Sequence, residues 1–209
     1  MSFLENTRKP NGFGGRLMVA MMNLGHRALA AWGFRFLPPL TNNAAILDCG
    51  CGGGANLRKL LQTHSHSRAV GIDYAAVSVE KARVVNRKPI AQGRCEVLRA
   101  DVSKLPFTDA RFDCVTAFET VYFWSDFAQS LAEVRRVLKP GGMLLICNEC
   151  GGERAGDFKW TDKIPGMTVY NAAELSAALK QAGFGNIQIH KHQKGWLCVT
   201  AEKSAASDR

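Results

Sequence analysis

The chain has 209 residues, 46% of them hydrophobic, which is enough material for one well-buried core. No apolar run reaches the roughly 18 residues of a membrane span, and the first residues lack a signal-peptide pattern, so we expect a soluble, cytoplasmic protein. The formal net charge of +9 is spread along the chain without basic runs or interleaved aromatic residues. The charge therefore gives little support to a nucleic-acid partner, without excluding one.

Seven cysteines, several of them inside apolar strand-like runs, indicate free thiols in a reducing compartment. Cys147 and Cys150 form a C-x-x-C pair. No second pair of Cys or His accompanies it at metal-ligand spacing, so we expect no metal site.

The N-terminal segment predicts a helical cap. From Arg16 to about Phe36, apolar residues recur at roughly helical spacing. Polar residues interrupt the pattern, which favours a helix packed on the domain over one lying on a membrane surface. We expect residues 1–43 to form this cap and residues 44–209 to form one globular domain.

Short apolar runs then alternate with helical patterns, which is typical of βαβ units. The expected fold is α/β: a doubly wound, Rossmann-like sheet of about seven strands, mostly parallel, with a C-terminal antiparallel hairpin and helices on both faces. The strands are expected at Ala45–Cys49, Ala69–Ile72, Cys95–Arg99, Phe112–Phe118, Gly142–Asn148, Ile187–His190 and Trp196–Ala201, and the helices at Ala55–Gln62, Val77–Asn86, Phe127–Leu138 and Ala172–Ala182.

The first strand runs directly into a glycine-rich turn, residues 48–54. Glycines permit a tight turn and let a ligand approach backbone N–H groups at a helix start. Alone, the turn also fits a dinucleotide fingerprint. Asp73 ends the second strand and Asp101 follows the third, at the edge where open α/β sheets bind ligands. Singly, Asp73 could cap a helix and Asp101 a turn, but together they favour a cofactor site.

The ordered motifs of residues 44–150 resemble the class I S-adenosylmethionine-dependent methyltransferases, specifically the small-molecule "methyltransferase type 11" kind. The resemblance implies S-adenosylmethionine as cofactor, with the glycine turn under its methionine part and Lys139–Gly142 as a purely structural turn. It also implies that Asp73 binds the ribose and that Asp101 accepts from the adenine amino group. The implied cofactor-binding residues are Asp48, Gly50, Cys51, Gly52, Asp73, Tyr74, Asp101, Val102 and Glu119.

By the same resemblance, the segment after the fourth strand faces the methyl group. It lacks the Asn/Asp-Pro-Pro-aromatic pattern of enzymes that methylate nucleic-acid bases or glutamine side chains. Glu119 needs a partner, because a buried unpaired carboxylate is costly; it contacts the cofactor, holds the substrate or acts as a base. Tyr122 and Trp124 belong either to the core or to the site. His26 is the first candidate for a general base, against the plainer alternative of a core or surface histidine.

The expected function is methyl transfer to an O, N, S or C atom of a small molecule by in-line displacement. The compact domain favours a small-molecule substrate. A methyltransferase acting on RNA or protein is the alternative that the basic charge supports. The alternative of a different class is an NAD-type Rossmann dehydrogenase or a noncatalytic nucleotide-binding protein, which Asp101 and the terminal hairpin disfavour.

Overall fold

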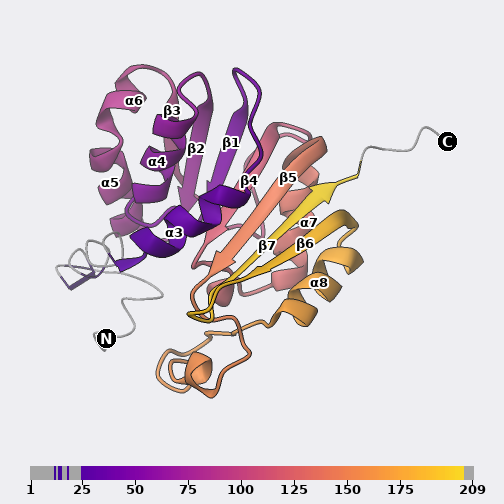
Figure 1. Ribbon diagram of the computed structural model, residues 1–209. Helices are drawn as coiled ribbons and strands as arrows, with labels where there is room; N and C mark the ends of the chain where they lie inside the picture. The colour runs from indigo at the N-terminus through magenta and orange to yellow at the C-terminus, as the bar shows by residue number, and fades with distance from the viewer. Residues whose placement is uncertain (1–11, 13, 16–17, 19–24, 205–209) are drawn as a thin grey trace.

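The computed structural model describes residues 12, 14, 15, 18 and 25–204. They contain one seven-stranded sheet, and this confirms the expected fold class (Figure 1). The strands are β1 (Ala45–Cys49), β2 (Arg68–Asp73), β3 (Cys95–Arg99), β4 (Phe112–Phe118), β5 (Leu138–Asn148), β6 (Phe184–Lys191) and β7 (Leu197–Lys203). Their order across the sheet is β3-β2-β1-β4-β5-β7-β6. Strands β1 to β5 pair in parallel, whereas β7 is antiparallel to both β5 and β6.

Helices cover both faces of the sheet (Figure 1). Their bounds are α3 (Arg27–Gly33), α4 (Ala55–Thr63), α5 (Ala76–Val85), α6 (Arg87–Ala91), α7 (Phe127–Val137) and α8 (Ala172–Gln181). One face packs against α4 and α5, and the other against α7 and α8. Within the described ranges, no helix is long and apolar enough to cross a membrane.

Helix α7 illustrates how the sequence specifies this packing. Leu131, Val134 and Val137 recur at helical spacing and are fully buried against the sheet. Asp126 begins the helix, because its carboxylate accepts a hydrogen bond from the Gln129 N–H at 3.0 Å. The apolar stripe and the cap together position α7 directly after the β4 end, where several site residues were expected.

The turn expected at Lys139–Gly142 lies inside β5 instead. Strand β5 begins at Leu138, and its register with β4 passes from Leu138 directly to Met143, so the four residues between them form an irregularity in the ladder. Lys139 donates to both carboxylate oxygens of Asp113 at 2.8 Å. The segment is structural, as expected, but the strand starts earlier than the sequence predicted.

Helix α3 is packed onto the sheet as part of the core. The expected helix began at Arg16, and most of its first half lies outside the described residues. Leu29 is 2% exposed and clusters with buried residues of β4, β5 and β7. A Cβ on Gly33 would lie 2.7 Å from Cys147 Sγ, so glycine permits this close approach. The division into a cap and a separate domain stays a prediction.

We predict that Leu29→Ala destabilises the protein by about 2–4 kcal/mol, because truncation leaves a cavity between α3 and the sheet. The exposed neighbour Ala28 is the control, and Ala28→Ser should cost less than about 0.5 kcal/mol. Urea denaturation measures both. A loss for Leu29→Ala no larger than that of the control would mean that α3 is not part of the folded core.

Candidate active site

The carboxyl ends of β1, β2, β4 and β5 meet at one edge of the sheet. Strand β1 lies between β2 and β4, so the chain order reverses there and the helices that follow β1 and β4 lie on opposite faces. Open α/β sheets bind ligands outside such a switch point. Most of the expected site residues lie along this edge.

Three of the four glycines in the turn after β1 have different roles. A Cβ on Gly50 would lie 2.0 Å from Thr120 Oγ1, and one on Gly54 would lie 2.5 Å from Asn86 Nδ2. These two glycines therefore allow close packing within the protein. Gly52 has a φ of +51° and nothing within 4 Å of its Cβ position, so it borders open space. Gly52 is the position where a ligand can approach the backbone.

Asp73 joins this turn to the one after β2. The carboxylate is 8% exposed; Oδ2 accepts from the Gly52 N–H at 3.0 Å, and Oδ1 accepts from the Ala75 N–H at 2.8 Å. Burial raises the pKa of Asp73, while these backbone hydrogen bonds act in the opposite direction. Asp73 does not take the helix N-cap position that the sequence left open, because Ala75 is the N-cap of α5; the Asp73 carboxylate links the two turns instead. The Ser78 side chain donates a third hydrogen bond to the carboxylate, which still keeps a lone pair for a ligand hydroxyl.

Asp48 holds an unsatisfied carboxylate oxygen under the turn. The residue is 2% exposed, and Oδ1 accepts from the Thr116 hydroxyl at 2.8 Å. Oδ2 is buried without a hydrogen-bond partner in the described structure. Burial raises the pKa of Asp48 to about 7, and the nearby charge of Asp73 adds to this. Such an atom marks a place for a missing donor, from water or from a ligand.

The remaining cofactor candidates have plainer surroundings. The exposed Asp101 accepts from both the N–H and the hydroxyl of Ser103, at 2.9 and 2.8 Å, so the expected turn-capping role is present. Val102 is buried in the main hydrophobic cluster. Tyr74 is half-buried, and its carbonyl accepts from Arg99. Burial raises the pKa of Cys51 well above its ordinary value, so its thiol stays protonated.

A second cluster brings His26 together with Glu119. His26 Nε2 lies 3.8 Å from Glu119 Oε2 and 3.9 Å from Glu149 Oε2. Glu119 Oε1 accepts from the Tyr122 hydroxyl at 3.2 Å and also from the Glu149 N–H. Glu119 has a φ of 59°, an uncommon conformation for a residue with a side chain. Strain of this kind concentrates at functional sites.

Burial decides the protonation of this cluster. It lowers the pKa of His26, although the charge of Glu149 acts in the opposite direction. It raises the pKa of Glu119 to about 8, which the backbone hydrogen bond from Glu149 partly offsets. Near neutral pH, His26 is therefore a neutral base and Glu119 is mostly protonated, so Glu149 is the carboxylate that would stabilise the protonated form of His26.

Glu149 is a residue that the sequence analysis missed. It follows β5 directly, so its place at the carboxyl edge was a signal that could have found it. With His26 and Glu119 it brings ligand-type atoms within 4.8 Å of one another, a separation that suits a cation. The sequence expected no metal, and no C-x-x-C ligand joins this group.

Trp124 lies in the core cluster rather than beside His26. It is 9% exposed and packs against Phe127, with ring centroids 5.9 Å apart. Its indole Nε1 is buried without a partner in the described structure. The expected site therefore divides into the cofactor turn and the cluster of His26, Glu119 and Tyr122, while Trp124 packs nearby on the α7 side of the sheet.

Comparison with known proteins agrees with this geometry. Residues 47–146 match the family model of a methyltransferase domain. The chain is 40% identical over 98 residues to the 24-methylenesterol C-methyltransferase 2 of Oryza sativa subsp. japonica, covering 47% of this chain and 27% of that protein. It is 30% identical over 170 residues to the O-methyltransferase resE of Aspergillus sclerotiorum, covering 78% of this chain and 63% of that protein. The chain thus spans less than two thirds of either relative.

A solved S-adenosylmethionine-dependent methyltransferase from Aquifex aeolicus has the same fold. Its TM-score is 0.73 at 21% identity, covering 90% of this chain and 97% of that one. The family match also removes the dehydrogenase alternative. The matched domain, the glycine turn and the strand-end carboxylates lead to one assignment: residues 47–146 form a methyltransferase domain, and the chain has the fold of the class I S-adenosylmethionine-dependent methyltransferases.

Proposed function

We propose that this chain transfers the methyl group of S-adenosylmethionine to an O, N, S or C atom of a small organic molecule. The observation that most supports this proposal is the open space at Gly52, near the unsatisfied Asp48 oxygen and the Asp73 carboxylate. These residues fit the cofactor: Asp48 offers an acceptor for its ammonium group, Asp73 for its ribose and Asp101 for its adenine amino group. When bound, the cofactor supplies a methyl group that its sulfonium makes electrophilic.

The protein's own task is to orient the acceptor and exclude water. His26 Nε2 takes a proton from an acceptor that carries one, and the Glu149 carboxylate stabilises the resulting imidazolium. Glu119, whose pKa burial raises to about 8, lies beside His26 as a mostly neutral acid. Tyr122 holds Glu119 in place through its hydroxyl. Backbone groups of Gly50, Cys51, Tyr74 and Val102 line the cofactor, and Trp124 supports the wall behind it.

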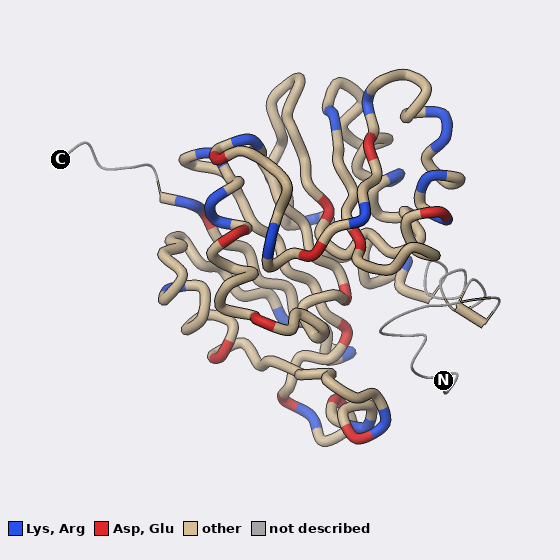
Figure 2. The backbone as a smooth tube through the Cα atoms, turned by 180° about the vertical axis from the view of Figure 1, so that it is seen from behind, with Lys and Arg blue, Asp and Glu red and all other residues tan. Residues whose placement is uncertain are grey.

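A small-molecule acceptor is favoured by the relatives, whose names are those of a sterol C-methyltransferase and an O-methyltransferase. The alternative acceptors, RNA and protein, rest on the net charge. Lys and Arg positions are scattered over the described chain in Figure 2 and form no continuous basic stripe there. Nucleic-acid binding typically uses such a stripe.

The direct test is transfer of labelled methyl groups. We expect label from S-adenosylmethionine to appear in members of a panel of sterols, phenols, thiols and small amines. Total RNA and a protein lysate serve as competing acceptors. Label in RNA or protein, with none in the panel, would contradict the small-molecule proposal and favour an RNA or protein methyltransferase.

His26 should control turnover more than cofactor binding. We expect His26→Gln to lower turnover by about tenfold or more, the usual share of a general base, while affinity for S-adenosylhomocysteine stays within a factor of about two. Because burial lowers the His26 pKa, wild-type turnover should fall as pH drops below 6.5 through that lowered value. An unchanged rate and pH profile in the variant would exclude His26 as the base.

The glycine turn gives a matched pair for cofactor binding. Gly52 and Gly93 both have positive φ and open space at the Cβ position, but Gly93 precedes β3 at the opposite edge of the sheet. Alanine at either position should cost about 1–2 kcal/mol of stability. Only Gly52→Ala should weaken S-adenosylhomocysteine binding, by about tenfold, because its methyl group enters the ligand space. Calorimetry measures the affinity of both variants for S-adenosylhomocysteine. If the two variants bind it equally well, the cofactor does not occupy the space at Gly52.

The buried Asp48 carboxyl predicts a pH-dependent stability. Its pKa rises from 3.8 to about 7 on folding, so the folded state holds the proton more tightly. The associated stability is complete below pH 3.8 and is lost as pH rises toward 7. Between pH 4 and 8, the wild type should therefore lose about 2–4 kcal/mol that Asp48→Asn does not lose.

The control is Asp162→Asn, which removes an exposed carboxylate and should leave the wild-type pH profile intact. Urea denaturation across the pH range measures all three proteins. If Asp48→Asn and the wild type have parallel profiles, the Asp48 carboxyl is not held protonated by burial.

A further inference from the structure

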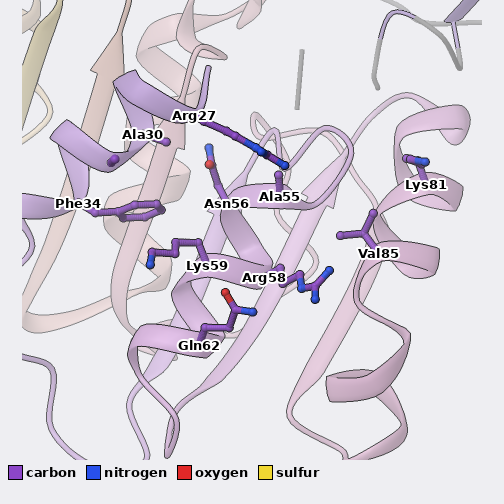
Figure 3. Close-up of a pocket in the computed structure, with 11 residues that line it drawn as sticks. Arg27, Ala30, Phe34, Ala55, Asn56, Arg58, Lys59, Gln62, Lys81 and Val85 are labelled. Carbon is purple, nitrogen blue, oxygen red and sulfur yellow. The ribbon is translucent and has the colours of Figure 1, made fainter. Parts of the chain in front are cut away.

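A groove of about 690 Å³ lies between α3, α4 and α5, over the exposed side of α4 (Figure 3). It is separate from the cofactor turn, because its described lining includes neither Gly52 nor Asp73. Arg27 extends from α3 across the first residues of α4 in Figure 3. The groove thus lies between three helices, and its described lining contains none of the residues assigned to the proposed reaction.

The charged residues that line this groove are all basic. Arg27, Arg58, Lys59 and Lys81 line it, and its described lining contains no acidic residue. None of the four forms an ion pair with another described residue. Like charges gathered in one hollow repel one another and attract an anion, more strongly there than on an open surface. The groove therefore has the charge that suits a phosphate group.

The rest of the groove is suited to a small, partly apolar ligand. Ala30, Phe34 and Val85 supply apolar walls, while Asn56 and Gln62 supply amide groups. The volume lies within the range of about 300–1,000 Å³ typical of small-molecule pockets. A nucleic-acid backbone or a membrane surface would instead need an extended basic face, and the basic positions outside the groove are scattered (Figure 2).

We propose that this groove binds a small organic phosphate whose phosphate group is held by Arg58, Lys59, Lys81 and Arg27 and whose apolar part lies against Phe34. Binding of this phosphate does not require the proposed methyl transfer. Because Arg27 directly follows His26, the ligand also holds the start of α3, which carries His26 to the carboxyl edge.

Calorimetry with n-octyl phosphate below its micellar concentration tests the site on the full chain. We expect saturable binding that weakens as salt increases, since exposed charges are screened. Inorganic phosphate and n-octanol should each bind more weakly, because each has only one half of the recognised chemistry. Saturating S-adenosylhomocysteine should leave octyl phosphate binding in place, and competition between the two would assign the groove to the cofactor site and contradict the proposal.

Two double variants that remove the same charge give the control. Arg58→Gln with Lys59→Gln should weaken octyl phosphate binding by about tenfold, whereas Arg87→Gln with Lys88→Gln, on the neighbouring α6, should change it less than about twofold. Equal losses would show diffuse attraction and overturn the proposal. So would absence of binding, or binding only to phosphatidylglycerol vesicles. Retained affinity for S-adenosylhomocysteine in all variants separates this result from a failure of the proposed function.

Discussion

The Asp73 carboxylate is the constraint on which the proposed cofactor site depends. One oxygen holds the Gly52 N–H and the other holds the Ala75 N–H, so a single buried side chain joins the turns after β1 and β2. Backbone hydrogen bonds to a carboxylate are among the stronger ones. They fix Gly52 in a left-handed conformation and keep open space beside it. Without this link, the two turns that flank the switch point would be positioned only by their own strands.

The second constraint is α3, which connects the sheet face to both candidate sites. Its inner side is buried against β4, β5 and β7 through Leu29. Its first turn carries His26 toward Glu119 and Glu149, while the next residue, Arg27, lines the basic groove. Helix α3 is thus both a piece of the core and the support of a proposed base. A packing change in α3 would therefore move His26 at the carboxyl edge and would also lower the stability of the protein.

Much of the fold could be predicted because it follows from local patterns. The buried runs gave β1, β3 and β4 to the residue, and the hairpin followed from its turn. The start of β5 was missed because Pro140 and Gly141 signal a turn, whereas the ladder continues around them as an irregularity. Local propensity cannot show that kind of tertiary accommodation.

The candidate site, like the fold, could be predicted only in part. Residues at strand ends were identifiable, because parallel strands bring their carboxyl ends to one edge. Glu149 was overlooked although it too follows a strand, since no motif marks it. The exact partners depend on three-dimensional approach: nothing in the sequence says that Glu119 Oε1 would accept from the Glu149 N–H, or that Trp124 would pack on the α7 side of the core.

The central claim is that the cofactor occupies the open space at Gly52. Backbone amide NMR during titration with S-adenosylhomocysteine tests it most directly, because each amide reports on its own surroundings. The account predicts the largest shifts at Gly52, at Asp73 to Ala75 and at Asp101 and Val102, with small changes in the exposed half of α4. No shifts, or largest shifts at Arg58 and Lys59, would contradict it.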